Sequence, residues 1–178
     1  MAIGQGPVRW TPIQAASAYA ALARGGYWIS PTFLIAADTD QDRRPVDLEL
    51  DPAAVKKVMQ GLDMVVNDPQ GTGHHINFDG EQEPIFNVPD VQLYGKSATA
   101  QPHQVLRIDS NGDGRISRED EIAKHGDHSW FVVLAQRPGS SRPDYVVVVL
   151  VEFGGSGSRV AGPITNQVLH AMRTEGYL

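Results

Sequence analysis

The segment 91–101 carries side chains whose types and order suit the binding of an anionic ligand. An apolar start and one glycine lead into Lys96, Ser97, Ala98 and Thr99, which place a cation and two hydroxyls close together. Small residues weaken a strand, so a run of them indicates a place where a ligand or another backbone comes close. We therefore expect a strand that faces an anionic, peptide-like ligand. The alternative is an edge strand whose lysine only discourages aggregation.

A second chemical pattern lies in the segment 109–120, where oxygen-bearing residues alternate along the chain. An EF-hand loop needs this spacing because oxygens from alternate residues must converge on one hard cation, with glycine at the sixth place for a sharp turn. The sequence fills the pattern in order with Asp109, Asn111, Asp113, Gly114, Arg115 (through its carbonyl), Ser117 and Asp120.

This pattern departs from an EF-hand at both ends. Its twelfth position is Asp120 rather than the longer glutamate, and the entering segment 103–108 does not have the pattern of a helix. The segment resembles a single dockerin-like calcium loop, with Ser117 as the cap of an exit helix. We expect a structural calcium ion that stiffens an insert spanning 102–126. The alternative is a surface turn with solvated acids.

The pair His74 and His75 follows a glycine-rich turn at 71–73. Neighbouring side chains on an extended segment point opposite ways, and no carboxylate lies at ligand spacing. We therefore expect solvated loop histidines here and not a metal site.

Composition excludes several functional classes. A hydrophobic content of 41% with 20% charged residues is typical of a globular protein, and 178 residues suit one domain. The net charge of -6 argues against a nucleic-acid binder, and the absence of cysteine excludes disulfides and thiolate chemistry. The longest apolar run, 145–151, is far shorter than a membrane span, so we expect a soluble chain.

Two helices are expected before the segment 91–101. Thr11 with Pro12 predicts the start of the first, which ends at the glycines 25–26, and Asp51 with Pro52 predicts the start of the second. The second repeats apolar residues at helical spacing, which indicates that one of its faces packs on the core.

The last third of the sequence predicts a hairpin and a covering helix. Strands over 127–136 and 144–153 flank a turn at 138–143. The unbroken apolar run of the second strand indicates burial on both faces, in the middle of a sheet. Apolar residues at helical spacing across 160–172 predict a final helix, in which Pro163 is tolerated only in the first turn.

In their order and spacing, four segments resemble the C-terminal half of the transpeptidase domain of a class B penicillin-binding protein. They are 3–26, similar to the family's helix after the active-site motifs; 95–101, which resembles the third motif Lys-Thr/Ser-Gly with its Thr-Ala-Gln tail; and 127–131 and 151–157, which look like the last two strands and the turn into the final helix.

The resemblance implies part of a β-lactamase-like fold of the α/β (α+β) class. We expect an antiparallel sheet of about three strands with covering helices, including a C-terminal helix. The whole chain, 1–178, would then be a single partial transpeptidase domain, with the EF-hand-like insert 102–126 within it.

The resemblance also implies acyl transfer, in which a serine attacks the D-alanyl-D-alanine end of a peptidoglycan stem peptide and β-lactams acylate the same serine. Lys96 would hold a proton network and favour the negative charge of the substrate. Ser97 would hydrogen-bond the terminal carboxylate, and the backbone N–H of Thr99 would donate to the developing oxyanion. Ala98 stands where the motif has glycine, and it places a methyl beside the substrate backbone.

The family's nucleophile and base motifs, Ser-x-x-Lys and Ser-x-Asn, do not occur in the sequence. We therefore expect no catalytic residue in this chain, which would be inactive alone, and a parent enzyme whose nucleophile precedes Ile3. The alternative is a non-catalytic, calcium-stabilised binding or scaffold module derived from that fold.

The resemblance predicts partners and a location as well. The strand 144–153 would have an unpaired edge, which favours association with the missing N-terminal half or with a second copy of the chain. The parent protein would be membrane-anchored, and it would face the periplasm or the cell exterior.

Overall fold

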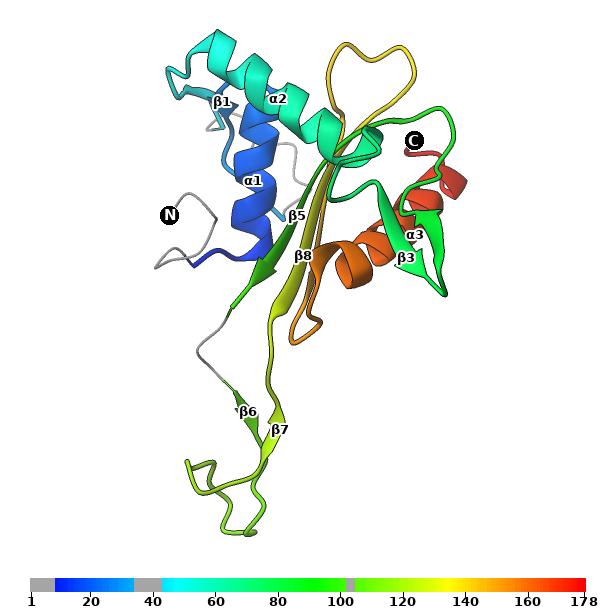
Figure 1. Ribbon diagram of the computed structural model, residues 1–178. Helices are drawn as coiled ribbons and strands as arrows, with labels where there is room; N and C mark the ends of the chain where they lie inside the picture. Colours follow the sequence, from blue (N-terminus) through cyan, green and yellow to red (C-terminus); the bar gives the residue numbers. More distant parts are fainter. Residues whose placement is uncertain (1–8, 34–42, 102–104) are drawn as a thin grey trace.

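The centre of the structure is a three-stranded antiparallel sheet. The computed structural model describes residues 9–33, 43–101 and 105–178 (Figure 1). The sheet has the strand order β5 (Gln92–Ala100), β8 (His128–Gln136) and β9 (Tyr145–Val151). The predicted strand at 91–101 and the predicted hairpin are thereby confirmed.

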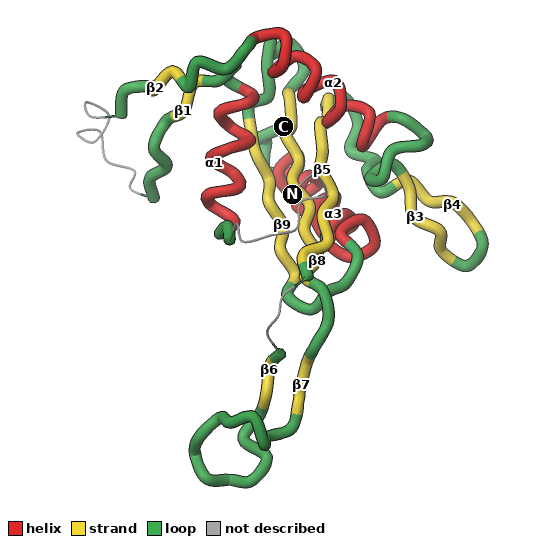
Figure 2. Tube along the Cα trace, turned by 60° about the vertical axis from the view of Figure 1, so that its left-hand side comes forward, coloured by secondary structure: helices red, strands yellow, loops and turns green. Residues whose placement is uncertain are grey.

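Helices cover both faces of this sheet, as Figures 1 and 2 show. The helix α1 (Pro12–Ala23) lies against β8 and β9 on one face of the sheet. On the other face, α2 (Pro52–Asn67) ends against β5, and the C-terminal helix α3 (Gly162–Thr174) packs on β8 and β9. A π-helical turn, η2 (Gly157–Ala161), precedes α3. The mixed α/β fold predicted from the sequence, with its C-terminal helix, is confirmed.

The first two helices begin at the predicted residues. The backbone N–H of Gln14 donates to Thr11 Oγ1 at 3.4 Å, and Gln14 Oε1 accepts from the Thr11 backbone N–H at 2.9 Å, which completes a capping box. At the second start, Asp51 Oδ1 accepts from the Ala53 backbone N–H at 2.9 Å. These bonds satisfy amides that have no partner inside the helix.

The core lies between the sheet and the layer formed by α3 and the end of α2. Ser97 lies opposite Phe131, and Phe131 opposite Val149, so these three residues share that face of the sheet. Phe131 is fully buried. The buried hydrophobic residues that form this core are Val66, Val88, Leu93, Phe131, Val133, Ala135, Val147, Ala161 and Leu169.

The expectation that the second hairpin strand is buried on both faces in the middle of the sheet is wrong, because the first hairpin strand has that position. β8 is central, and five consecutive residues in it, 131–135, are buried. β9 is an edge strand among the described residues, and Val147 is its only buried residue. The apolar side chains of β9 are therefore only partly covered by helices, and one backbone edge of this strand is unpaired among the described residues.

In the described part of the chain, three two-stranded sheets lie outside the central one. They are β1 (Tyr27–Trp28) with β2 (Val46–Asp47), β3 (His75–Phe78) with β4 (Glu81–Pro84), and β6 (Leu106–Arg107) with β7 (Ile122–Lys124). The exit helix predicted after Ser117 is wrong, because β7 follows the loop instead. Residues 3–8, the start of the first family-like segment, lie outside the described residues. Residues 102–104, the start of the predicted insert, lie outside them as well.

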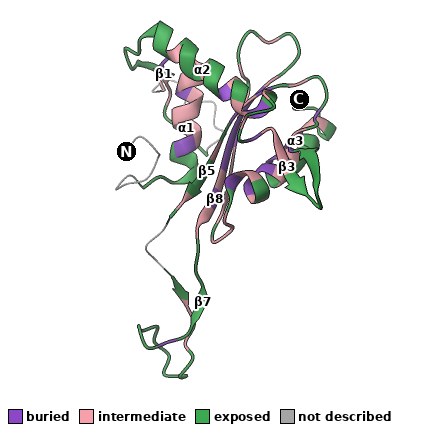
Figure 3. Ribbon diagram, viewed as in Figure 1, coloured by how far each residue is buried: buried purple, intermediate pink, exposed green. Residues whose placement is uncertain are grey.

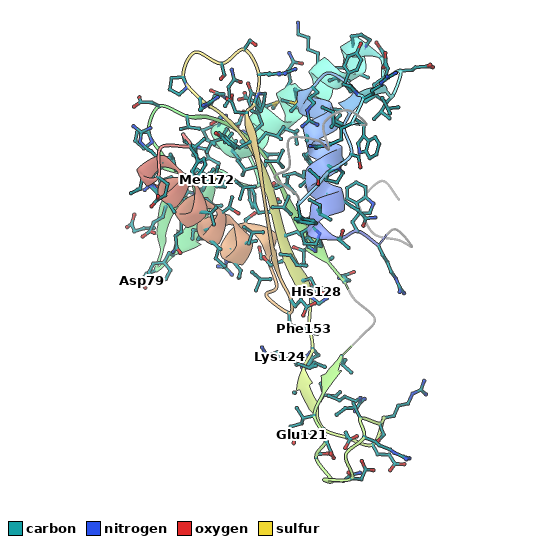
Figure 4. All side chains as sticks on the ribbon, turned by 180° about the vertical axis from the view of Figure 1, so that it is seen from behind. Asp79, Glu121, Lys124, His128, Phe153 and Met172 are labelled. Atoms are coloured by element: carbon teal, nitrogen blue, oxygen red, sulfur yellow. The ribbon has the colours of Figure 1, made fainter. Side chains whose placement is uncertain are left out.

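The β6–β7 hairpin forms an arm that projects from the end of the sheet. Figure 3 shows it exposed along most of its length, and Figure 4 places Glu121 and Lys124 on it. At its base the backbone N–H of Phe153 donates to His128 Nδ1 at 2.9 Å, and the two rings meet edge to face. This bond makes Nδ1 of His128 an acceptor, so a neutral His128 carries its proton on Nε2.

None of the helices in the described part of the chain is long and apolar enough to cross a membrane.

Candidate functional site

The predicted ligand-binding residues lie on β5, at the open edge of the central sheet. Lys96 and Ala98 point to the face covered by α1, whereas Ser97 and Thr99 point to the face covered by η2 and α3, because side chains alternate along a strand. β5 pairs with β8 only, in the part of the chain that is described. Its other edge is paired with no strand in that part of the chain, and the Leu93 carbonyl accepts from Asn67 Nδ2 at 3.0 Å.

The surroundings of Lys96 make its ammonium easier to deprotonate. Protein atoms desolvate the ammonium and lower its pKa, although the residue as a whole is exposed. Desolvation acts in this direction because a low-dielectric environment disfavours the charged form. The Lys96 ammonium also donates to the backbone carbonyl of Ser97. Lys96 therefore lies along β5 next to the hydroxyl-bearing residue.

The Ser97 hydroxyl is held by a residue from outside β5. Ser97 Oγ lies 2.9 Å from Thr72 Oγ1, in the loop after α2. The hydroxyl of Ser158, in η2, donates to the backbone carbonyl of Thr72. Three segments that are distant in the sequence thus meet at Ser97: the loop after α2, β5 and η2.

A glycine in η2 packs directly on the backbone of β5 and β8. The backbone N–H of Gly157 donates to Thr99 Oγ1 at 3.4 Å. A Cβ at Gly157 would lie 2.5 Å from the carbonyl oxygens of both Ala98 and Trp130. Such a contact is too short for any side chain, so glycine at this place allows η2 to lie on the strands. η2 therefore lies close against β5 and β8.

Three residues of this arrangement were not identified from the sequence: Thr72, Gly157 and Ser158. The sequence had indicated only a glycine-rich turn at 71–73 and, through the resemblance, a turn within 151–157 into the final helix. A hydroxyl between two glycines was the available signal at Thr72, but nothing in the linear pattern linked it to Ser97.

The predicted calcium loop is a set of tight turns at the tip of the arm. Asp109 accepts from the backbone N–H groups of Gly112, Asp113 and Gly114 at 2.7 to 3.2 Å. Gly114, at the sixth position, has φ +80°, which is the left-handed conformation that the sharp turn requires. The geometry of this turn is thus explained by the glycine and by the carboxylate of Asp109.

The end of the loop is closed by Asp120, which is covered by its own loop rather than by the core. Asp120 Oδ2 accepts from the Ser117 backbone N–H at 2.6 Å, and Oδ1 accepts from Ser110. These bonds, the Ser117 backbone N–H foremost, lower the pKa of Asp120. No three His, Asp or Glu side chains in the described residues gather as a metal-binding group.

The two adjacent histidines contact each other. His74 Nδ1 lies 3.3 Å from His75 Nδ1, and the rings meet edge to face. His75 begins β3. Both are half-buried at the end of the glycine-rich turn.

The structure thus has a helix-covered antiparallel sheet whose edge strand, β5, carries Lys96 and Ser97. Residues 1–170 match the family of the penicillin binding protein transpeptidase domain, and the chain therefore belongs to this family.

Two known proteins are similar to this chain. It is 28% identical over 174 residues to peptidoglycan D,D-transpeptidase MrdA of Haemophilus influenzae. This match covers 94% of this chain and 24% of MrdA. The crystal structure of penicillin binding protein 2X from Streptococcus thermophilus has a similar fold, with a TM-score of 0.52 and 19% identity over 90% of this chain and 22% of that one. The chain thus spans less than a quarter of either relative.

Proposed function

We propose that this chain supplies one wall of the acyl-transfer site of a peptidoglycan D,D-transpeptidase. The observation that carries the proposal is the position of Lys96 and Ser97 on the open edge of β5, with the pKa of Lys96 lowered and Ser97 held by Thr72. An ammonium and a hydroxyl at this edge suit a peptide that ends in a carboxylate. The family membership supports the same reaction class.

Each residue of the motif then has a separate task. Lys96 holds the proton network and favours the negative charge of the substrate, and Ser97 donates to the terminal carboxylate. The backbone N–H of Thr99 donates to the developing oxyanion, an interaction that is worth about 3 to 4 kcal/mol in other enzymes. The methyl of Ala98 lies on the same face as Lys96, because these residues are two apart on the strand.

The attacking serine in this proposal comes from residues outside the given sequence, which contains neither Ser-x-x-Lys nor Ser-x-Asn. The chain alone should then give no penicillin-labelled band that survives denaturing electrophoresis. The same chain in the full-length transpeptidase should be labelled. A covalent adduct on the isolated chain would refute the proposal.

Variants of the full-length protein test the role of the motif. Lys96→Ala and Ser97→Ala should slow labelling by fluorescent penicillin at least tenfold, since a hydrogen bond to a charged group contributes about 1.5 to 3 kcal/mol. Lys56→Ala is the matched control, because Lys56 is an exposed lysine on α2. Wild-type labelling rates in both motif variants would contradict the proposed function.

We also propose that the open edge of β9 pairs with another strand. The partner is the N-terminal part of the transpeptidase domain or, when that is missing, a second copy of the chain. β9 is apolar and has one hydrogen-bonded neighbour among the described residues. Light scattering across a concentration series should show association of the isolated chain. A monomer at every concentration with well-dispersed amide NMR signals would contradict it.

The loop at the tip of the arm is proposed to bind calcium as a structural ion. Asp109, Asn111, Asp113, Ser117 and Asp120 would supply side-chain oxygens and Arg115 its carbonyl, in the order of an EF-hand loop. Calcium should raise the melting temperature of the wild type, because an ion bound only by the folded state stabilises it.

A variant pair tests the calcium proposal. Asp113→Asn should remove most of the shift in melting temperature, whereas Asp79→Asn, in the turn between β3 and β4, should retain it (Figure 4). A melting temperature that does not respond to calcium would leave the loop as a surface turn.

The parent protein is proposed to be membrane-anchored with this domain facing the periplasm or cell exterior, where peptidoglycan is assembled.

A further inference from the structure

Thr72 lies between two glycines, Gly71 and Gly73, that are each closely packed against neighbouring elements. A Cβ at Gly71 would lie 2.3 Å from the carbonyl oxygens of Met64 and Val65, at the end of α2. A Cβ at Gly73 would lie 2.6 Å from Cζ of Phe131, the fully buried ring of β8. Both positions admit only glycine, because contacts this short do not occur for real side chains. The loop therefore holds Thr72 in a place set by α2 and by the core.

Hydrogen bonds complete this placement. The backbone N–H of Gly71 donates to the carbonyl of Asp68 at 2.8 Å, and that of Gly73 donates to the carbonyl of Val65 at 2.9 Å. Ser158, from η2, donates to the carbonyl of Thr72. These bonds use backbone groups of the loop and leave the Thr72 hydroxyl for Ser97 Oγ, which lies 2.9 Å away and is its one hydrogen-bond partner among the described residues.

We propose that Thr72 is a positioning residue of the acyl-transfer site, whose hydroxyl donates to Ser97 Oγ and so directs the Ser97 hydrogen toward a carboxylate ligand. This inference rests on the proposed function of Ser97. It adds a residue outside the third motif that acts through Ser97 and does not itself touch the ligand.

The direction of the bond follows from the chemistry of the ligand. A carboxylate only accepts hydrogen bonds, so Ser97 must donate its single hydrogen to it. Ser97 Oγ can then only accept from Thr72, which becomes the donor. A hydroxyl that accepts one hydrogen bond becomes a stronger donor in the next, so the chain from Thr72 through Ser97 to the carboxylate is cooperative.

Three variants of the full-length transpeptidase test this role. The readout is the rate of acylation by a penicillin with a free carboxylate, compared with the rate for its methyl ester. Thr72→Val keeps the shape but removes the donor, and it should slow acylation by the free acid about fivefold to tenfold. Thr72→Ser restores a hydroxyl and should recover acylation to within about twofold of wild type. The ester, which lacks the negative charge, should respond less to Thr72→Val.

A second comparison separates this inference from the function on which it rests. If Thr72 acts through Ser97, then Thr72→Val should add little to Ser97→Ala in the double variant. Equal acylation by Thr72→Val and wild type, with Ser97→Ala slowed, would overturn the role of Thr72 and leave the proposed function standing. No effect of Ser97→Ala would overturn both. Failure of Thr72→Ser to recover the rate, with an unchanged melting temperature, would also overturn the role of Thr72.

Discussion

Gly95→Ala is expected to destabilise the fold, because α2 lies directly on β5 at this position. A Cβ at Gly95 would lie 2.5 Å from Val66 Cγ1 and 3.0 Å from Phe131 Cε1. Both side chains are buried, at 6% and 0% exposure, so neither can move away freely. Overpacking of this kind costs about 1 to 3 kcal/mol. Gly95 also precedes Lys96, so the same strain displaces the ammonium.

Gly61→Ala is the matched control. Gly61 lies inside α2, and a Cβ there would meet no atom within 4 Å. This substitution should stabilise the helix by about 1 kcal/mol, because glycine is a poor helix former. The two variants should therefore differ by about 2 to 4 kcal/mol in the free energy of unfolding.

Urea denaturation followed by far-UV circular dichroism measures both variants. At a slope of about 2 kcal/mol/M, a difference of 2 kcal/mol separates the two midpoints by about 1 M. If Gly95→Ala unfolds at the same urea concentration as wild type while Gly61→Ala is stabilised, then close packing of α2 on β5 is not what fixes β5, and the reasoning fails.

Other substitutions test the remaining supports of the fold. Ser129→Ala should cost about 2 kcal/mol in urea denaturation, because its buried hydroxyl accepts from the Ala161 backbone N–H at 3.0 Å and leaves that amide unpaired when removed. Hydrogen bonds, chiefly from the Arg137 side chain, lower the pKa of Asp144 from 3.8 to about 2. Because the folded state has the lower pKa, this stabilisation is complete above about pH 4 and is lost as the pH falls through about 2. Asp144→Asn should therefore flatten the melting temperature across that window. Asp51→Ala removes a helix cap and should cost about 1 kcal/mol of stability by the same denaturation assay.

The elements with strong local signals could be predicted from the sequence. Caps at Thr11 and Asp51 gave two helix starts, and the apolar spacing after Pro163 gave the last helix, because local hydrogen bonds and periodicity decide these features. The strand at 91–101 followed from its apolar start and small residues. Its place on an open edge, also weighed from the sequence, is confirmed for the described residues.

The parts that were missed depend on contacts between distant segments. The hairpin of β3 and β4 lies in a polar stretch, with residues 81–84 all exposed, so it has no alternating apolar pattern to reveal it. The exit helix after Ser117 was expected from an EF-hand pattern, but Ile122 pairs with Arg107 on the arm instead. Strand pairing across an insert is a tertiary preference, and it overrides a local cap.

The strand β5, which carries Lys96 and Ser97, is held in place by close packing at three glycines. Gly73 and Gly95 bring the end of α2 against Phe131, and Gly157 brings η2 against the backbone of β5 and β8. A side chain at any of these three positions would push a helix away from the strand that carries Lys96. The positions of Lys96 and Ser97 are thus determined by how closely the neighbouring elements approach β5. The short sequence 96–99 alone therefore does not fix the geometry of these side chains.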